Sequence, residues 1–161
     1  MRITHPFEPV FDSRSRILIL GSFPSVKSRE EGFFYGHPQN RFWRMLAAVY
    51  GEDVPTDIPA KKRILIGHEL ALWDAAGQCE IEGSRDSSIR SAVPTDLSII
   101  LTNARIERVL CNGQTAGRLY QRQQQPMTGI PAMILPSTSP LNAAWSMERL
   151  VDVWGKALKS E

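Results

Sequence analysis

Short, uniformly apolar runs recur along the chain, separated by longer stretches of mixed character. Residues 17–20 and 70–73 have the length of strands. They carry no alternation of apolar and polar side chains, which predicts strands that are buried on both faces. Residues 132–135 have the same character, and residues 106–111 end in the apolar run Val109-Leu-Cys111 and are also predicted to form a strand. The pattern therefore predicts four buried strands.

Between these runs, apolar residues recur at the three- and four-residue spacing of amphipathic helices. Asn40 and Thr95 are suitable N-caps, Gly51 can end a helix, and Pro59 suits a first helical turn. The polar residues 78–91 are expected to be irregular. The predicted helices cover residues 41–50, 59–69, 95–102, 115–123 and 143–158.

Strands that alternate with helices indicate a parallel sheet, because right-handed crossovers place the helices on its two faces. We therefore expect a three-layer α/β/α fold with a central, mostly parallel four-stranded sheet, formed by residues 1–161 as one domain. Ligands of such sheets bind at the carboxyl ends of the strands. This rule predicts a site built from residues 21–25, 74, 112–113 and 136–142.

The overall composition is that of an ordinary globular protein, with 42% apolar and 22% charged residues. No apolar run approaches the roughly 18 residues of a membrane span, and the first residues lack the apolar core of a signal peptide. We expect a monomer in the cytoplasm that makes no membrane contact. The net charge of +2 is too small to indicate a nucleic-acid partner by itself.

The cysteines and histidines do not follow the spacing of a metal site. Cys79 and Cys111 are far apart in sequence, and His5, His37 and His68 are scattered singly. We therefore expect no metal and no other cofactor.

Several motifs nonetheless point to a family. GSFPS, FFYGHPQNRFW, LALWDAAGQCEIEGSRDSSI, LCNG and LPSTSP resemble, in order and over nearly the whole chain, the hypoxanthine-DNA glycosylase branch of the uracil-DNA glycosylase superfamily. The mismatch-specific uracil-DNA glycosylases are also similar, but their first loop reads GINPG, and Phe23 stands where their asparagine would be. Because that asparagine orients water in the mismatch branch, its absence favours deoxyinosine over uracil.

The resemblance implies a uracil-DNA glycosylase-like fold and a monofunctional DNA glycosylase that removes hypoxanthine from DNA in base excision repair. Its partner would be DNA, as a duplex with a damaged base, and whether single strands are also processed stays open. Two alternatives stay open. One is a mismatch-type uracil or xanthine DNA glycosylase, and the other is a non-catalytic nucleic-acid-binding module on the same fold.

Asn40 is the catalytic residue that the resemblance implies. Cleavage of an N-glycosidic bond passes through an oxocarbenium-like sugar, so the protein must position a water and stabilise charge on the departing base. The carbonyl of Asn40 can accept a hydrogen bond from water and direct it at the anomeric carbon. The structural alternative is that Asn40 only caps the helix that follows it.

A base in a duplex must be flipped into the pocket before it can be cut out. Phe23 and Tyr35 are candidates to stack on it, although aromatic residues at such positions are often core residues. Asp74 can accept from N1–H of hypoxanthine, unless it is only a turn or cap residue. The predicted base pocket comprises Gly21, Ser22, Phe23, Pro24, Tyr35, Asp74 and Asn112.

The loop Pro136-Ser-Thr-Ser-Pro140 resembles the superfamily's second motif, which holds DNA phosphates and inserts a wedge into the base stack. We expect DNA contacts from Ser25, Ser137, Thr138 and Ser139, with helix capping as the alternative. Leu141 is the candidate wedge.

His37 is expected to be a turn residue or to orient Asn40, with general-base catalysis as the alternative. A hydrolase triad of Ser22 or Ser137 with His37 and Asp74 would be a rival enzyme class. The chain has no GxSxG motif to support it.

Overall fold

The computed structural model describes residues 2–159. Its centre is a parallel sheet with the strand order β3-β2-β6-β7, in which Ile19 pairs with both Leu72 and Leu110. The predicted four-stranded parallel sheet is confirmed. The strands are β2 (Ile17–Gly21), β3 (Leu70–Asp74), β6 (Arg108–Asn112) and β7 (Ala132–Leu135).

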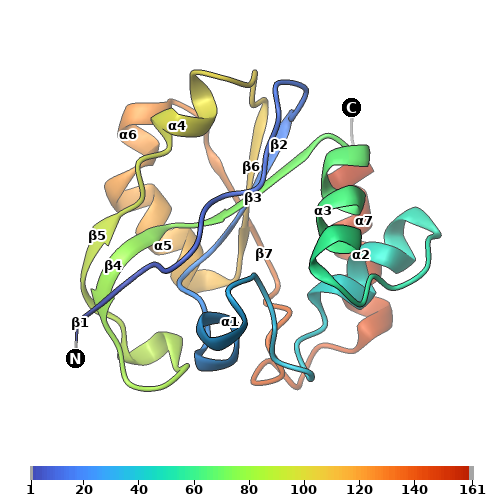
Figure 1. Ribbon diagram of the computed structural model, residues 1–161, viewed down its shortest axis with the longest axis horizontal. Coiled ribbons are helices and arrows are strands. Elements are labelled where there is room, and N and C mark those ends of the chain that lie inside the picture. The colour runs from blue at the N-terminus through green and yellow to red at the C-terminus, as the bar shows by residue number, and fades with distance from the viewer. Residues whose placement is uncertain (1, 160–161) are drawn as a thin grey trace.

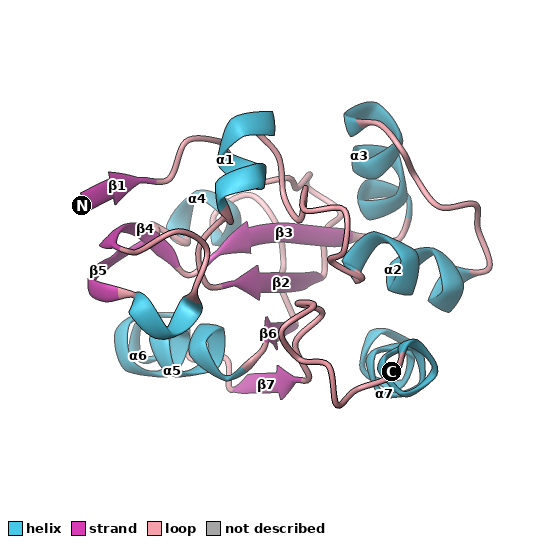
Figure 2. Ribbon diagram, turned by 90° about the horizontal axis from the view of Figure 1, so that it is seen from below, coloured by secondary structure: helices cyan, strands magenta, loops and turns pink. Residues whose placement is uncertain are grey.

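Helices cover both faces of this sheet (Figures 1 and 2). One side carries α2 (Phe42–Tyr50), α3 (Ile58–Gly67) and α7 (Met147–Lys159). The opposite side carries α4 (Ser98–Leu101), α5 (Gln114–Gln123) and α6 (Gln125–Thr128). The predicted three-layer α/β/α architecture is therefore also confirmed.

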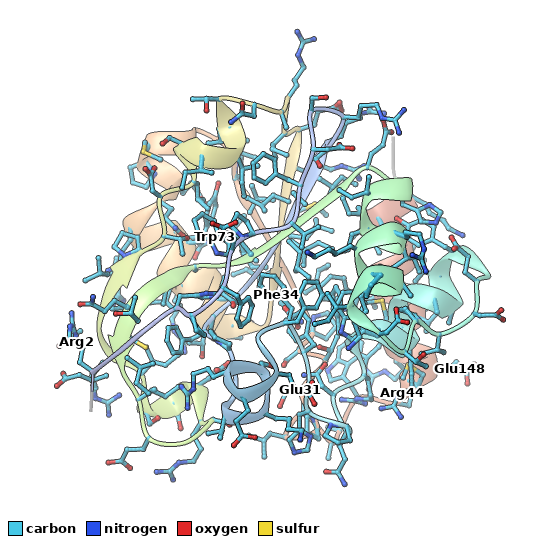
Figure 3. The ribbon with its side chains drawn as sticks, in the orientation of Figure 1. Arg2, Glu31, Phe34, Arg44, Trp73 and Glu148 are labelled. Atoms are coloured by element: carbon cyan, nitrogen blue, oxygen red, sulfur yellow. The ribbon has the colours of Figure 1, made fainter. Side chains whose placement is uncertain are left out.

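The core lies between the sheet and these two layers. Leu18 and Ile19 project from opposite faces of β2, and both are completely buried, which explains the unbroken apolar run. Phe34 lies at the centre of the molecule, whereas Arg2 and Glu148 lie at opposite edges (Figure 3). Trp154 of α7 is also fully buried and packs edge-on against Phe42 of α2.

A second, antiparallel sheet of β1 (Arg2–Thr4), β4 (Ala76–Glu80) and β5 (Arg90–Pro94) was not expected. The irregular structure predicted for residues 78–91 is wrong at both ends. β4 follows β3 after a single residue, and β5 is mostly exposed. Because these strands bury few side chains, they lack the apolar signal that identified the central sheet.

Local capping explains the other differences from the sequence prediction. The short polar helix α1 (Val26–Glu31) was missed, and Ser25 caps its start. Thr95 does not cap a helix, because its hydroxyl donates to the backbone oxygen of Asp74. Residues 143–146 precede α7 and do not belong to it. Pro59 lies in the first turn of α3 as predicted.

All four parallel strands run toward the lower edge of Figure 1, so their carboxyl ends open there. Figure 2 views this end directly. α1, the loop after β7, and the segment between β4 and β5 surround it. That segment contains the single-turn helix η1 (Asp86–Ser88). No helix among residues 2–159 is long and apolar enough to cross a membrane.

Candidate active site at the strand ends

A pocket of about 1140 Å³ opens at the carboxyl ends of the parallel strands. Its walls come from the loops after β2, β3, β6 and β7, from α1, and from the segment between β4 and β5. Every residue that the sequence placed at a site lines this one pocket. These residues are Gly21, Ser22, Phe23, Pro24, Ser25, Tyr35, Asn40, Asp74, Asn112, Ser137, Thr138, Ser139 and Leu141.

The side-chain oxygen of Asn40 accepts two hydrogen bonds. One comes from the hydroxyl of Thr138 and the other from the backbone N–H of Phe42, both at 2.9 Å. Asn40 therefore caps α2 and faces the pocket at the same time. Two bonds use both lone pairs of a carbonyl oxygen, so the expected contact from this oxygen to water does not fit the structure. Within residues 2–159, the Nδ2 group has no acceptor and is left for a ligand or water.

Thr138 is completely buried and links Asn40 to Asn112. Its N–H donates to Oδ1 of Asn112 at 3.0 Å, and its hydroxyl oxygen accepts from Nδ2 of Asn112 at 3.0 Å. Its carbonyl accepts from the N–H of Arg41 at 3.1 Å. The expected contact of Thr138 with DNA conflicts with this burial. Thr138 instead holds the amides of Asn40 and Asn112 in position.

Asp74 ends β3 with a side chain that is almost fully buried, and one of its carboxylate oxygens lies 2.8 Å from Nε2 of His5. The other nitrogen of His5 faces the N–H of Phe7 at 3.4 Å. Nε2 is therefore the nitrogen that donates to Asp74. Sequence reasoning missed His5, because no local pattern connects two residues 69 positions apart.

Gly21 lies against this carboxylate at the end of β2. A Cβ atom at this position would lie 2.4 Å from Oδ1 of Asp74 and 2.8 Å from the hydroxyl of Tyr35. Such distances are far below van der Waals contact, so only glycine fits here. The close approach brings the carboxylate and the phenol to the floor of the same pocket.

Tyr35 and Phe23 form parts of the pocket wall and also pack inside the protein. The Tyr35 ring stacks on Phe42 with centroids 4.3 Å apart, and its backbone has a left-handed φ of 53°. Burial raises the pKa of the Tyr35 hydroxyl, as does the charge on Asp74, while the nearby Asn112 amide lowers it. The hydroxyl therefore stays protonated, and it is a buried donor without a partner in the described chain.

Asp86 is a second carboxyl group at the pocket that sequence reasoning missed. Its Oδ1 accepts from the hydroxyl of Ser22 at 2.7 Å. Burial raises the pKa of the Asp86 carboxyl, the hydrogen bond from Ser22 opposes this, and the charge on Asp74 adds to the increase. Asp86 lies in the segment expected to be irregular, so nothing in the sequence indicated that its side chain lines the pocket.

The loop between β7 and α7 forms the opposite rim. Oγ of Ser137 accepts from the N–H of Ser139 at 3.1 Å, and Oγ of Ser139 accepts from the N–H of Leu141 at 3.2 Å. Helix capping by these serines is therefore wrong, and each hydroxyl keeps its proton for a further acceptor. Leu141 is 78% exposed at the tip of the loop.

Ser25 and His37 have local roles. The Ser25 hydroxyl caps α1 by accepting from the N–H of Ser28, and it donates to Oγ of the same serine. His37 is exposed, and its Nδ1 accepts from the N–H of Gln39. Because the ring makes no contact with Asn40 or Asp74 in the described structure, the expected turn role fits and the hydrolase triad is not assembled.

The described part of the chain contains no group of three or more His, Cys, Asp or Glu side chains that could hold a metal ion. Both cysteines are buried and free. The groups that line the pocket include the amides of Asn40 and Asn112, the carboxyls of Asp74 and Asp86, the imidazole of His37, several hydroxyls and aromatic walls.

Comparisons with known proteins place this sequence in one family. Residues 8–158 match the uracil DNA glycosylase superfamily. The chain is 34% identical to a hypoxanthine DNA glycosylase of Methanosarcina barkeri, over 95% of this chain and 96% of that protein. It is 35% identical to a hypoxanthine DNA glycosylase of Methanosarcina acetivorans, over 91% of this chain and 93% of that one.

A solved structure of similar fold is consistent with the same superfamily. The solution NMR structure of a Methanosarcina acetivorans protein, provisionally assigned as a uracil DNA glycosylase, superposes with a TM-score of 0.82. The two are 30% identical, and the match covers 99% of this chain and 98% of the other. The chain belongs to the uracil DNA glycosylase superfamily.

Proposed function

We propose that this protein is a DNA glycosylase that removes hypoxanthine from DNA by hydrolysing the N-glycosidic bond of deoxyinosine. Two relatives that share about a third of its residues over more than nine-tenths of the chain carry the name hypoxanthine DNA glycosylase. The observation that carries the proposal is the amide of Asn40, which is held by two hydrogen bonds beside a pocket with ample room for a purine.

The pocket would receive the base after the nucleotide has been flipped out of the duplex. Phe23 and Tyr35 supply flat apolar walls, and Gly21 lets the Asp74 carboxylate approach the backbone at the end of β2. Hypoxanthine presents a donor at N1–H beside a carbonyl acceptor. Asp74, whose orientation is fixed by His5, would accept from N1–H. The backbone N–H groups after Gly21 would face the carbonyl.

Asn40 would position the attacking water through its free Nδ2 group. An amide N–H that donates to the water oxygen leaves a lone pair of that oxygen for the anomeric carbon. Since the sugar becomes an oxocarbenium-like cation as the base departs, the water needs accurate placement more than it needs a strong base. Thr138 and the N–H of Phe42 hold the amide in this orientation, and Asn112 in turn holds Thr138.

DNA would lie across the rim formed by the loop between β7 and α7. The free hydroxyl protons of Ser137 and Ser139 would donate to phosphate oxygens, and Leu141 would fill the gap left by the flipped base. The Ser25 hydroxyl is used within α1, so a contact from this residue to DNA would have to use its backbone or an alternative rotamer. We further propose that residues 1–161 act as one domain and as a monomer, on duplex DNA in the cytoplasm.

The test is an excision assay with labelled duplexes that carry hypoxanthine, uracil or xanthine at one position. Alkali converts each abasic site into a strand break. We expect breaks at hypoxanthine. Preferred cleavage at uracil, which the provisional name of the similar solved structure would favour, would replace hypoxanthine by uracil in the proposal. Binding without any cleavage would instead indicate a nucleic-acid-binding module.

The Asn40→Ala variant tests the mechanism. We expect its single-turnover rate on hypoxanthine to fall by about 100-fold or more, which is typical for the loss of a positioned polar group at a reacting centre. Asn103→Ala is the matched control, because Asn103 lies at the end of α4 and does not line the pocket. A folded Asn40→Ala protein with a normal rate would remove Asn40 from the mechanism.

A further inference from the structure

Two carboxyl groups meet at the pocket in different surroundings. Asp74 is paired with His5 at 2.8 Å, and both side chains are about 95% buried from solvent, since only 5% and 4% of their surfaces are exposed. Asp86 is not part of any ion pair formed by residues 2–159. Its one hydrogen bond comes from Ser22, to Oδ1. The second oxygen, Oδ2, is therefore available to a ligand.

The segment that carries Asp86 is attached to the pocket wall. Oγ of Ser84 accepts from the N–H of Val26 at 2.8 Å, and the guanidinium of Arg29 donates to the backbone oxygen of Gly83 at 3.0 Å. Both contacts reach α1. With the Ser22 contact, they hold Asp86 over the floor where the base would bind.

Charged and titratable groups reach this region from each element that packs around it. Neither nearby arginine neutralises Asp86, because Arg85 pairs with Glu82 at 3.1 Å and Arg29 donates to a backbone oxygen. The charge that acts on Asp86 is the like charge of Asp74. The groups around Asp86 are Arg29, Tyr35, Asp74, Cys79 and Arg85.

The two carboxyl groups are therefore suited to opposite tasks. Asp74 already accepts a hydrogen bond from His5 and is placed to accept a further one from the base. Burial raises the pKa of Asp86, and no cation pairs with it in the described structure, so its carboxyl keeps a proton to a higher pH than an ordinary aspartate. Two carboxyl groups whose surroundings differ in this way are a common basis for the division between an acceptor and an acid in one active site.

We propose that Asp86 is the general acid of the reaction and protonates N7 of the departing hypoxanthine. This inference rests on the proposed function, because it names the group that assists the same bond cleavage. The C1′–N9 bond breaks, and its electron pair moves into the purine ring. The proton moves from Asp86 to N7, so that hypoxanthine leaves as a neutral molecule.

The remaining steps balance the charge. The water held by Asn40 adds to C1′ of the cationic sugar and forms the C1′–O bond of the abasic site. That oxygen then loses one proton, which returns to the carboxylate of Asp86 directly or through solvent. No other reactant is needed, and the acid is regenerated. Because uracil has no imidazole ring and thus no N7, this acid assists only purines.

Asp86→Asn tests the proposal, since asparagine keeps the size and the contact with Ser22 but cannot transfer a proton. We expect a fall of at least about 100-fold in single-turnover excision of hypoxanthine, a typical contribution of general acid catalysis, with DNA binding unchanged. Glu82→Gln removes the same charge from the same segment outside the pocket, and we expect it to stay within about threefold of the wild type.

The pH profile gives a second readout. Because the protonated carboxyl is the active form, the wild-type rate should fall as the pH rises through the raised pKa of Asp86. This fall should be absent in Asp86→Asn. An unchanged profile in the variant, or a rate within threefold of the wild type, would overturn the proposal.

A modified substrate tests the same step without any variant and so does not depend on how Asp86→Asn folds. In 7-deazahypoxanthine a C–H replaces N7. We expect the wild-type protein to excise this base at least about 100-fold more slowly than hypoxanthine. Equal rates would exclude proton transfer to N7 and leave the glycosylase function intact. A wild-type protein that excises no hypoxanthine at all would instead defeat the proposed function, and this inference with it.

Discussion

Thr138 bridges two amide side chains with a single hydroxyl group. The hydroxyl donates to Asn40 and accepts from Asn112, while the backbone N–H of Thr138 bonds the other atom of the Asn112 amide. The direction of each amide is therefore set by its neighbour. Because the carbonyl of Asn40 is occupied, its NH₂ group is left for a ligand, and in the proposed mechanism the orientation of the water would depend on the buried Thr138.

Thr138→Val should uncouple this arrangement, because valine has the same shape without the hydroxyl. The change leaves Nδ2 of Asn112 without its acceptor, which should cost about 1–3 kcal/mol of stability. It also frees the Asn40 amide to rotate, so we expect single-turnover excision to fall by about tenfold while DNA binding is retained. Urea unfolding and single-turnover assays measure the two effects.

Thr138→Ser is the matched control, since serine keeps the hydroxyl and loses only a methyl group. Its rate should lie close to that of the wild type. If serine and valine slow excision equally, the loss comes from packing, and Thr138 does not position Asn40 through its hydroxyl.

The sequence identified the pocket residues that follow strands, because these positions are fixed by the topology of a parallel sheet. Gly21, Asp74 and Asn112 are examples, and all three line the pocket. His5 and Asp86 were missed because they contact the pocket residues Asp74 and Ser22, which lie 69 and 64 positions away in sequence. Contacts at such separations leave no periodic signal.

At the level of elements, one side chain makes three hydrogen bonds to the loop between β7 and α7. The guanidinium of Arg41 donates to the backbone oxygens of Ser139 and Asn142, both at 3.1 Å, and to that of Trp145. Arg41 follows Asn40 directly in sequence. The turn that carries the proposed catalytic amide is therefore bonded to the loop that exposes Leu141 at the rim.

Leu141→Ala should separate base extrusion from bond cleavage. A wedge is needed only where a base must leave a stack, so we expect slower excision from duplex DNA and an unchanged rate on single strands. Since 78% of Leu141 is exposed, the fold should lose little stability. Parallel single-turnover assays on the two substrates decide the matter. An equal loss on both would reject the wedge.

The elements differ in how far their sequence could predict them. The strands of the central sheet are buried on both faces, so each one consists of consecutive apolar residues, as β2 shows. The second sheet buries only a small cluster that includes Phe23, Cys79 and Ile81, and its strands look polar in sequence. α1 was missed for the same reason, because Ser28 is its only buried residue among those described.

At the scale of the whole molecule, the pocket lies where the two sheets meet. β4 continues the chain from β3 and pairs with β1, which places His5 beside Asp74. The central sheet supplies the floor, and the segment between β4 and β5 supplies Asp86. The small sheet thus contributes groups to the candidate site that the three-layer core does not contain.

His5→Ala tests this connection between the two sheets. It removes the hydrogen-bond partner of a nearly buried carboxylate, which should cost about 1.5–3 kcal/mol of unfolding free energy. Because Asp74 also loses its fixed orientation, binding of DNA that contains hypoxanthine should weaken more than binding of undamaged DNA.

His68→Ala is the control variant for His5→Ala. His68 also pairs with a carboxylate, that of Glu52, but at the surface, so its loss should cost at most about 1 kcal/mol and leave DNA binding unchanged. Equal destabilisation by the two variants would mean that burial adds nothing to the His5 contact. An unchanged preference of His5→Ala for damaged DNA would mean that Asp74 holds its position without help from the small sheet, and that the two sheets serve the pocket independently.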